Sequence, residues 1–165
     1  MLTDVMSQPP KYDARLHIVL HQPEIPHNTG SVGRTCVAAG CKLWLVRPLG
    51  FRLDDYYLRR AGLDYWEHLD WEAVDDWPAL LERLPGRRPW LFTKTAPTSY
   101  LDARFARGDV LVFGNESQGL PPSLREQHAE RLLRIPIRPE ARSLNLSNAV
   151  GIVTFEALRQ FDAGA

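Results

Sequence analysis

Short apolar runs that alternate with helical segments are the feature of this sequence that most restricts its fold. The run RLHIVLH at 15–21 has the composition and alternation of a strand. A helix is expected next, capped by Asn28 or Thr29 and stopped by Gly40. The run KLWLVR at 42–47 predicts a second strand. Strand, helix and strand joined by short links form a βαβ unit, whose two strands are parallel.

The same alternation continues along the rest of the chain. PWLFTK at 89–94 and DVLVF at 109–113 predict two further strands, and the second run is typical of a strand covered on both faces. RLLRIPI at 131–137 predicts a fifth strand that ends near Pro136. We therefore expect an α/β fold with a mostly parallel sheet flanked by helices. Further helices are expected from Asp54 to Arg60, from the acidic stretch 64–76 to Leu84, and from Leu146 to Phe161.

Length and charge favour one ordinary folded domain. The 165 residues are 44% hydrophobic and 24% charged, which excludes a disordered chain. We expect a flexible extension at 1–14, followed by a single domain at 15–165. The net charge is zero, but residues 1–85 carry 9 basic and 12 acidic residues, and residues 86–165 carry 11 and 8. This difference, −3 against +3, permits an anionic partner on the C-terminal half.

Several classes of protein are disfavoured by what the sequence lacks. No apolar run approaches the roughly 18 residues of a membrane span, and residues 1–11 do not have the order of a signal peptide. We expect a cytoplasmic protein with no membrane partner. Cys36 and Cys41 have no second pair to complete a zinc site, and the five histidines have no ligand spacing, so we expect reduced thiols and no metal.

The common nucleotide and hydrolase signatures are absent as well. The sequence has neither G-x-G-x-x-G after a strand nor G-x-x-x-x-G-K-[ST]. The segment around Ser117 lacks the first glycine of a nucleophile elbow, because Asn115 stands there. An ordinary dinucleotide, P-loop or serine-hydrolase site is therefore not predicted.

Three segments carry more polar chemistry than a scaffold needs, and each follows an expected strand or begins a helix. The first, EIPHNTGSVGRT at 24–35, brings Asn28, Gly30 and Arg34 to the start of a helix, where amides and a guanidinium can hold an anion. A capped helix with a surface arginine would look the same.

The second and third segments lie further along the chain. LVFGNESQGLPPS at 111–123 is a stiff loop with Glu116 at its centre, a residue that could equally be a carboxylate that caps nearby amides. IPIRPEARSLNLSNAVG at 135–151 gathers more hydrogen-bonding side chains than one helix cap uses. These side chains are Ser143, Asn145, Ser147 and Asn148.

Together, in this order, the three segments resemble the motifs of the SPOUT superfamily of RNA methyltransferases, in its SpoU-like branch. Asn28, Gly30 and Arg34 match N-x-G-x-x-x-R. The stretch 113–121 matches F-G-x-E-x-x-G-L-P, and 143–149 matches S-x-N-L-S-N-A. RRAGLDYWE at 59–67 is similar to the small bacterial members that methylate the wobble ribose of tRNA. The resemblance covers residues 16–160.

This resemblance implies a SPOUT fold with a deep C-terminal trefoil knot, S-adenosyl-L-methionine as cofactor, S-adenosyl-L-homocysteine as product, and no metal. It implies a homodimer formed through the last helix, and a tRNA substrate methylated at the 2′-oxygen of cytidine or uridine 34 in tRNA(Leu) isoacceptors. Arg34 would be catalytic. Cofactor contacts would come from Leu91, Gly114, Ile135, Ser143 and Leu144. Substrate contacts would come from Asn28, Glu116, Asn145, Arg138 and Arg142, with Arg59 and Arg60 as further phosphate contacts.

Other functions remain open from the sequence. The substrate could be another tRNA or rRNA ribose, or the protein could be a catalytically silent RNA-binding relative. Intact Arg34, Glu116 and 143–149 disfavour the silent relative. A different α/β enzyme with a nucleotide ligand is disfavoured by the missing phosphate-binding loops.

Overall fold

The computed structural model describes residues 9–54, 56, 60 and 65–162. Its strands form one sheet in the order β3-β2-β1-β5-β4-β6, and every pair of neighbours is parallel. The expected α/β class with a parallel sheet is confirmed. The strands are β1 (His17–His21), β2 (Lys42–Val46), β3 (Trp71–Val74), β4 (Trp90–Phe92), β5 (Val110–Phe113) and β6 (Leu132–Leu133).

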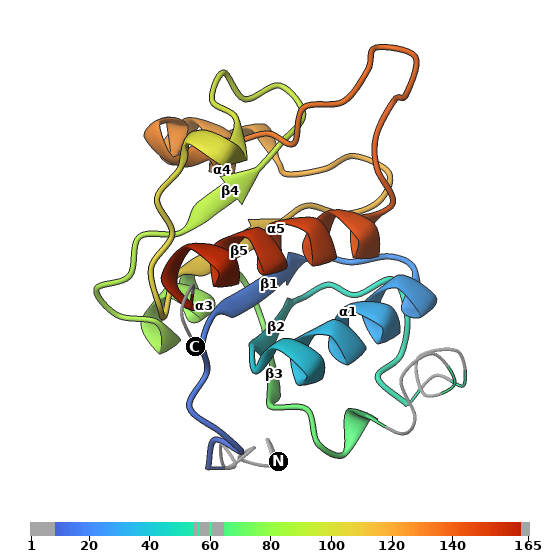
Figure 1. Ribbon diagram of the computed structural model, residues 1–165. Coiled ribbons are helices and arrows are strands. Elements are labelled where there is room, and N and C mark those ends of the chain that lie inside the picture. The colour runs from blue at the N-terminus through green and yellow to red at the C-terminus, as the bar shows by residue number, and fades with distance from the viewer. Residues whose placement is uncertain (1–8, 55, 57–59, 61–64, 163–165) are drawn as a thin grey trace.

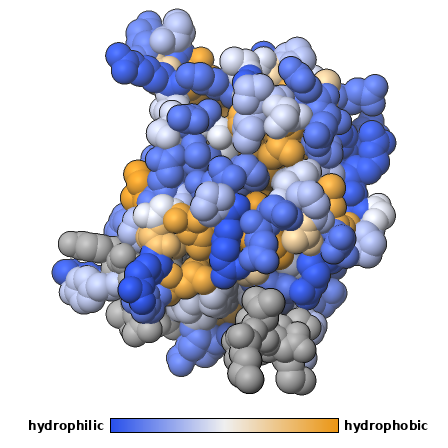
Figure 2. Space-filling view, turned by 180° about the vertical axis from the view of Figure 1, so that it is seen from behind, coloured by the Kyte–Doolittle hydropathy of each residue, from blue (hydrophilic) through white to orange (hydrophobic). Residues whose placement is uncertain are grey.

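Helices cover both faces of the sheet. On one face α1 (Pro26–Ala39) and α5 (Leu146–Asp162) lie side by side, with α5 over the middle of the sheet (Figure 1). On the other face α3 (Trp77–Arg83) packs near β2 and β3. Seen from that side, hydrophobic side chains reach the surface in patches among hydrophilic ones (Figure 2). Shorter helices are α4 (Pro122–Gln127), η1 (Tyr100–Asp102) and η2 (Ala129–Arg131).

The core follows from the alternation of side chains along the central strands. Ile18 and Leu111 point toward α1 and α5, whereas Val19 and Val112 point toward the α3 face. All residues of β1 and β5 are buried, as the apolar run at 109–113 predicted for a strand covered on both faces. The sheet is therefore a two-sided core, which fixes the carboxyl ends of its strands.

Two expectations about strands need correction. The acidic stretch before Leu84 was expected only to lead into a helix, but residues 71–74 form the edge strand β3. Its Glu72 carboxylate is offset by Lys42 Nζ at 3.2 Å, so the edge strand tolerates the charge. The expected strand at 131–137 pairs with β4 only at Leu132–Leu133. Beyond it, Arg134 bonds to the 98–100 segment instead, and Pro136 has no N–H to extend the ladder.

The start of α1 also differs from expectation. Neither Asn28 nor Thr29 caps it, because the helix begins at Pro26 with Ile25 as the capping residue and no side-chain cap bond. Proline suits this position, since its fixed φ is helical and its missing N–H would have had no partner. The end was predicted correctly: Gly40 adopts φ 70° and its N–H closes the last turn.

The cysteines and three tryptophans are buried or packed in the core. Cys36 and Cys41 are free and buried, as predicted. Trp66 and Trp71 pack against each other with ring centroids 5.2 Å apart, and Trp77 is buried. The helix expected at 54–60 lies largely outside the described residues. Among the residues that are described, no helix is long and apolar enough to cross a membrane.

Candidate active site

A pocket of about 550 Å³ opens at the carboxyl ends of β4 and β5. Three stretches that are far apart in the sequence line it: 92–95, 113–120 and 135–146. Asn28, from the first turn of α1, also faces it. Ligands of open α/β sheets bind at this edge. The fold therefore brings residues of all three polar sequence segments to one place.

Glu116 joins the second segment to the first. Its Oε2 accepts a hydrogen bond from the Glu24 N–H at 2.8 Å, and its Oε1 accepts from the Ile25 N–H at 3.1 Å and from Asn28 Nδ2 at 3.3 Å. These amides precede α1, where backbone N–H groups lack helical partners. The carboxylate thus binds the amides just before α1 from a loop about ninety residues away, which is the role of capping nearby amides that the sequence left open for Glu116.

Asn145 joins the third segment to the same group. Its Oδ1 accepts from the N–H groups of Ser147 at 2.9 Å and Asn148 at 3.3 Å, which makes it the cap of α5. Its Nδ2 donates to Asn28 Oδ1 at 3.1 Å. Because Asn28 also donates to Glu116, a continuous chain of hydrogen bonds connects all three segments. The side chains of Glu116, Asn28 and Asn145 therefore form hydrogen bonds that hold the three segments together.

Glycines close the loop 114–119. A side-chain carbon on Gly114 would lie 2.1 Å from the carbonyl carbon of Gly119, so no other residue fits without movement of the backbone. Gly119 has φ +69°, which favours glycine, and its N–H donates to the Asn115 carbonyl at 3.1 Å. Ser117 Oγ donates to Glu24 Oε1 at 2.6 Å. The loop is tightly folded and is tied to the entrance of α1.

We predict that Glu116→Gln loosens this junction. An amide nitrogen would replace one acceptor oxygen and would face an N–H donor, at a cost of about 1–3 kcal/mol. We expect the Tm to fall by roughly 2–12 °C and the Glu24 and Ile25 amides to exchange faster. Thermal unfolding and hydrogen exchange measure these effects, with Glu126→Gln on the exposed side of α4 as the control. Unchanged exchange at both amides would contradict the assigned bonds.

About half of the residues that line the pocket are apolar or glycine, and the others are polar or charged. The rings of Phe92 and Phe113 stack with centroids 4.8 Å apart, and Ile135 and Leu144 lie on the opposite stretch of chain. An apolar slot with backbone donors and acceptors suits an adenine base. Leu91 is placed differently from the other expected cofactor contacts, because its fully buried side chain packs on the α3 face and does not line the pocket.

Arg34 is exposed and does not line the pocket. It lies six positions after Asn28, which corresponds to about 9 Å along α1 and roughly 120° around it. Its guanidinium lies over the ring of Tyr65, 4.7 Å from the centroid, with Nη2 3.4 Å from the hydroxyl. The preceding Gly33 is required there because an added side-chain carbon would lie 2.9 Å from the Trp66 ring. The segment 65–66 thus positions Arg34 away from the pocket of its own chain.

The remaining expected substrate contacts lie outside the pocket. Arg138 pairs with Glu140 at 3.0 Å, and Arg142 is exposed beside Ser143. Both belong to the 134–145 segment near the pocket mouth. Arg60 is exposed, and Arg59 lies outside the described residues. These arginines are exposed and do not line the pocket, so they are placed to contact an extended anion at the surface.

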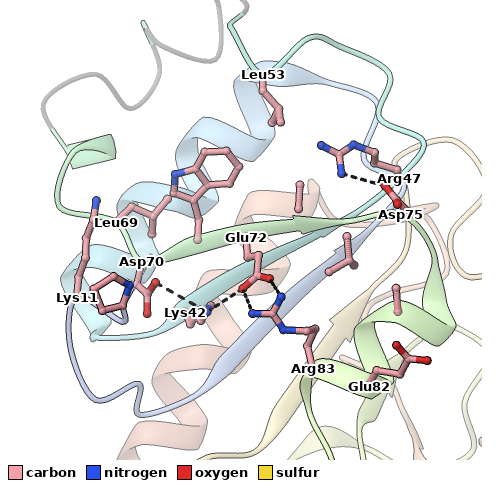
Figure 3. Close-up of a pocket in the computed structure, with 15 residues that line it drawn as sticks. Lys11, Lys42, Arg47, Leu53, Leu69, Asp70, Glu72, Asp75, Glu82 and Arg83 are labelled. Atoms are coloured by element: carbon pink, nitrogen blue, oxygen red, sulfur yellow. Dashed lines mark hydrogen bonds and ion pairs between the residues drawn. The ribbon is translucent and has the colours of Figure 1, made fainter. Parts of the chain in front are cut away.

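A second hollow, of about 650 Å³, runs along β3 and is not favoured as the site. Most of its charged groups are paired with one another: Lys42 lies 3.2 Å from Glu72 and 3.9 Å from Asp70, and Arg83 Nη2 donates to Glu72 at 3.1 Å (Figure 3). None of the three polar segments lines it. Its charges neutralise each other, so little is left to hold a ligand.

Metal chemistry has no candidate among the described residues, where no group of three histidine, cysteine or acidic side chains could hold an ion. His21, at the end of β1, is buried, and burial lowers the pKa of its imidazole. Its ring packs edge-on against Trp77, 6.3 Å between centroids, on the face away from the pocket. His21 is therefore a neutral packing residue.

Sequence reasoning missed part of the pocket wall. Phe92, Thr93 and Lys94 line it although only Leu91 of that strand was expected, and Arg125 reaches it from α4, an element that was not predicted. The position of 92–95 at the carboxyl end of a predicted strand could have indicated the first group. Nothing in the local pattern singles out Arg125.

The sequence and the fold were compared with known proteins. The model of the SpoU rRNA methylase family matches residues 15–155. The tRNA (cytidine(34)-2'-O)-methyltransferase of Methylovorus glucosotrophus (strain SIP3-4) is 47% identical, over 90% of this chain and 97% of its own. A structure solved for work on the 2-OH methylation of C/U34 on tRNA is 48% identical, covers 90% of this chain and 97% of that chain, and has a TM-score of 0.86.

A more distant match is the AdoMet-bound rRNA methyltransferase from Sinorhizobium meliloti. It is 27% identical with a TM-score of 0.79, over 92% of this chain and 58% of that one. The matched sequence and the similarity of the fold both point to the same family. The protein is a member of the SpoU rRNA methylase family.

Proposed function

We propose that the protein is an S-adenosyl-L-methionine-dependent tRNA methyltransferase that modifies the ribose 2′-oxygen of the wobble nucleotide, cytidine or uridine 34, of tRNA(Leu) isoacceptors. The observation that carries the proposal is the hydrogen-bonded junction of Glu116, Asn28 and Asn145 at a pocket that is lined in part by apolar side chains. Support for the substrate comes from the Methylovorus relative, matched over nearly its whole length. Such an enzyme would work in the cytoplasm, where tRNA is found.

The pocket fits the proposed cofactor. Its volume of about 550 Å³ lies within the usual range of roughly 300–1,000 Å³ for small-molecule sites. Gly114, Ile135, Ser143 and Leu144 line it and are the proposed contacts, while Leu91 would act only through its backbone next to Phe92. The bound cofactor supplies an electrophilic methyl group on a sulfonium, and S-adenosyl-L-homocysteine is the product. The reaction needs alignment and removal of a proton from the hydroxyl, and no metal step is proposed.

Arg34 is the proposed catalytic residue. A guanidinium has a pKa above about 12, so it does not serve as the base. It would clamp a phosphate and stabilise the developing alkoxide. The groups that surround the ribose hydroxyl would be held in place by Asn28, Glu116 and Asn145. Phosphates of the tRNA would be contacted at the surface by Arg138, Arg142 and Arg60. Exposure of all three arginines supports that role.

We further infer a homodimer with a shared tRNA site. Ile152 and Phe155 on α5 are 41% and 54% exposed, whereas Val150, Val153 and Ala157 of the same helix are buried. Arg34 lies outside the pocket of its own chain, so a second chain would have to bring it to the substrate. The family likeness also supports a single domain at 15–165 after the 1–14 extension, and a knot formed by the last third of the chain.

We predict that Phe155→Glu separates the dimer. Burial of a phenylalanine contributes about 2–3 kcal/mol, and a carboxylate in its place adds a desolvation cost, so the dimer Kd should rise at least about 100-fold. Sedimentation equilibrium measures the change. Leu101→Glu is the control, because Leu101 is 58% exposed on η1, remote in sequence from α5. Equal effects of both variants, or a monomeric unmodified protein, would contradict this interface.

The proposed activity is tested by transfer of labelled methyl from S-adenosyl-L-methionine to total tRNA. Nuclease mapping then locates the labelled nucleotide. We expect label at the 2′-oxygen of nucleotide 34. Label at another ribose would retain the methyltransferase and reject the wobble assignment. Cofactor binding without label on any tRNA or rRNA would favour a silent relative.

A further inference from the structure

Arg125 is the charged group of the pocket that the structure leaves without a partner. Three charged residues line the pocket: Lys94, Glu116 and Arg125. Both carboxylate oxygens of Glu116 already accept hydrogen bonds, from the amides before α1 and from Asn28. Lys94 Nζ is exposed and lies 3.5 Å from the Arg142 carbonyl. Arg125 forms no ion pair and no side-chain hydrogen bond with any described residue.

The position of Arg125 is fixed by the fold. It lies in α4, directly after the loop 114–120, and its neighbour Leu124 is buried in the core of the α3 face. The Arg125 backbone N–H donates to the Pro121 carbonyl at 3.2 Å. The side chain is half-buried, and its Nε is completely buried with no acceptor. Leaving such a donor unpaired is costly. The Nη groups of the same guanidinium also have no acceptor among the described residues, and they are the donors that a ligand in the pocket can reach.

The rest of the pocket decides which anion fits. Its apolar side chains, which include Phe92, Phe113 and Leu144, suit a base and a thioether chain. Its other cation, Lys94, lies with Nζ 3.5 Å from the Arg142 carbonyl. A guanidinium presents a planar fork that matches a carboxylate. The proposed cofactor has one anionic group, the carboxylate of its amino-acid end.

We propose that Arg125 binds the carboxylate of the cofactor's amino-acid end and thereby selects adenosyl ligands that carry it. This inference rests on the proposed function, since it assumes that the pocket takes S-adenosyl-L-methionine. It assigns Arg125 to binding and leaves Arg34 as the catalytic residue. A guanidinium would also bind an RNA phosphate, and the experiment below distinguishes that phosphate from the carboxylate of the cofactor.

Isothermal titration of the full-length protein tests the assignment without catalysis. Two ligands are compared: S-adenosyl-L-homocysteine and its decarboxylated analogue. We expect the unmodified protein to bind the carboxylate form about 10- to 100-fold more tightly. Arg125→Gln should lose that preference while keeping its affinity for the decarboxylated analogue. Arg125→Lys keeps the charge without the fork and should retain part of the preference. Arg104→Gln, an exposed arginine outside the pocket, is the control and should match the unmodified protein.

The outcomes separate this inference from the proposed function. Equal preference in Arg125→Gln and in the unmodified protein would overturn the carboxylate contact. Weaker tRNA binding by Arg125→Gln in a filter assay, with S-adenosyl-L-homocysteine affinity unchanged, would assign the residue to RNA phosphate and also overturn it. If the unmodified protein binds neither adenosyl ligand, the proposed function itself is contradicted, and the inference about Arg125 falls with it. Thermal unfolding of each variant checks folding, and Arg125→Lys supplies the comparison if Arg125→Gln is unstable.

Discussion

Arg34→Ala is expected to lower methyl transfer to tRNA by about 10²- to 10³-fold or more, while the affinity for S-adenosyl-L-homocysteine changes by less than about twofold. The reason is geometric. Arg34 is exposed on α1 and lies outside the pocket, so its loss removes a cation from the substrate side and leaves the cofactor slot intact. Single-turnover transfer and isothermal titration measure the two quantities separately.

Two control variants test whether the charge of Arg34 and its position are what matter. Arg34→Lys keeps a cation but not the bidentate fork, and should recover only part of the rate. Arg104→Ala removes an exposed arginine elsewhere and should be neutral. Equal loss of transfer and of cofactor affinity, or a large fall in Tm, would assign Arg34 a structural role through its contact with Tyr65.

Gly114→Ala is expected to have the second large effect, on cofactor binding and on stability together. The added carbon would lie 2.1 Å from the Gly119 carbonyl carbon and 2.3 Å from the Leu120 nitrogen, and both are backbone atoms. The loop cannot yield cheaply, because Gln118 N–H donates to Asn115 Oδ1 at 2.9 Å across it. Overpacking costs about 1–3 kcal/mol, so the Tm should fall by roughly 2–12 °C, and displacement of the pocket wall should weaken binding about 100-fold.

Gly119→Ala is the matched control in the same loop. An added carbon there meets nothing within 4 Å, so the cost is only the strain of φ +69°, about 1 kcal/mol. Thermal unfolding and titration with S-adenosyl-L-homocysteine compare the two variants. If both lose affinity equally, backbone strain governs the loop and the close contact at Gly114 does not.

The two variants together test whether the site is shared. In a purified mixed dimer of Arg34→Ala and Gly114→Ala, one pocket is intact and belongs to the chain that lacks Arg34. If the other chain supplies Arg34 to that pocket, the mixed dimer should recover up to about half of the unmodified activity, although each variant alone is strongly impaired. No recovery in a confirmed mixed dimer would place Arg34 at the site of its own chain.

Much of the fold could be predicted because its signals are local. The strands β1, β2, β4 and β5 are contiguous apolar runs, and Gly40 ends α1 by its own backbone conformation. The edge strand β3 could not be predicted in this way, since its charged Glu72 is tolerated only because Lys42 and Arg83 lie beside it. Likewise β6 is shortened by the competing 98–100 segment, which pairs with Arg134.

The candidate site shows the same division. The residue types and spacings of Asn28, Glu116 and Asn145 marked them as functional candidates, and the structure places all three at one pocket. Their bonds to one another span about ninety residues or more, and no local pattern reports such a distance. Arg125 was not predicted for the same reason: its importance comes from having no partner within the pocket.

The sequence by itself determined the parallel α/β class, the three polar segments and the family, because apolar periodicity and motif spacing are properties of neighbouring residues. Only the tertiary structure decided that Glu116 binds the amides before α1, that Arg34 lies on Tyr65 away from its own pocket, and that the Arg125 side chain has no partner among the described residues. Each of these depends on which distant groups satisfy or fail to satisfy a polar atom, and folding alone brings those groups together.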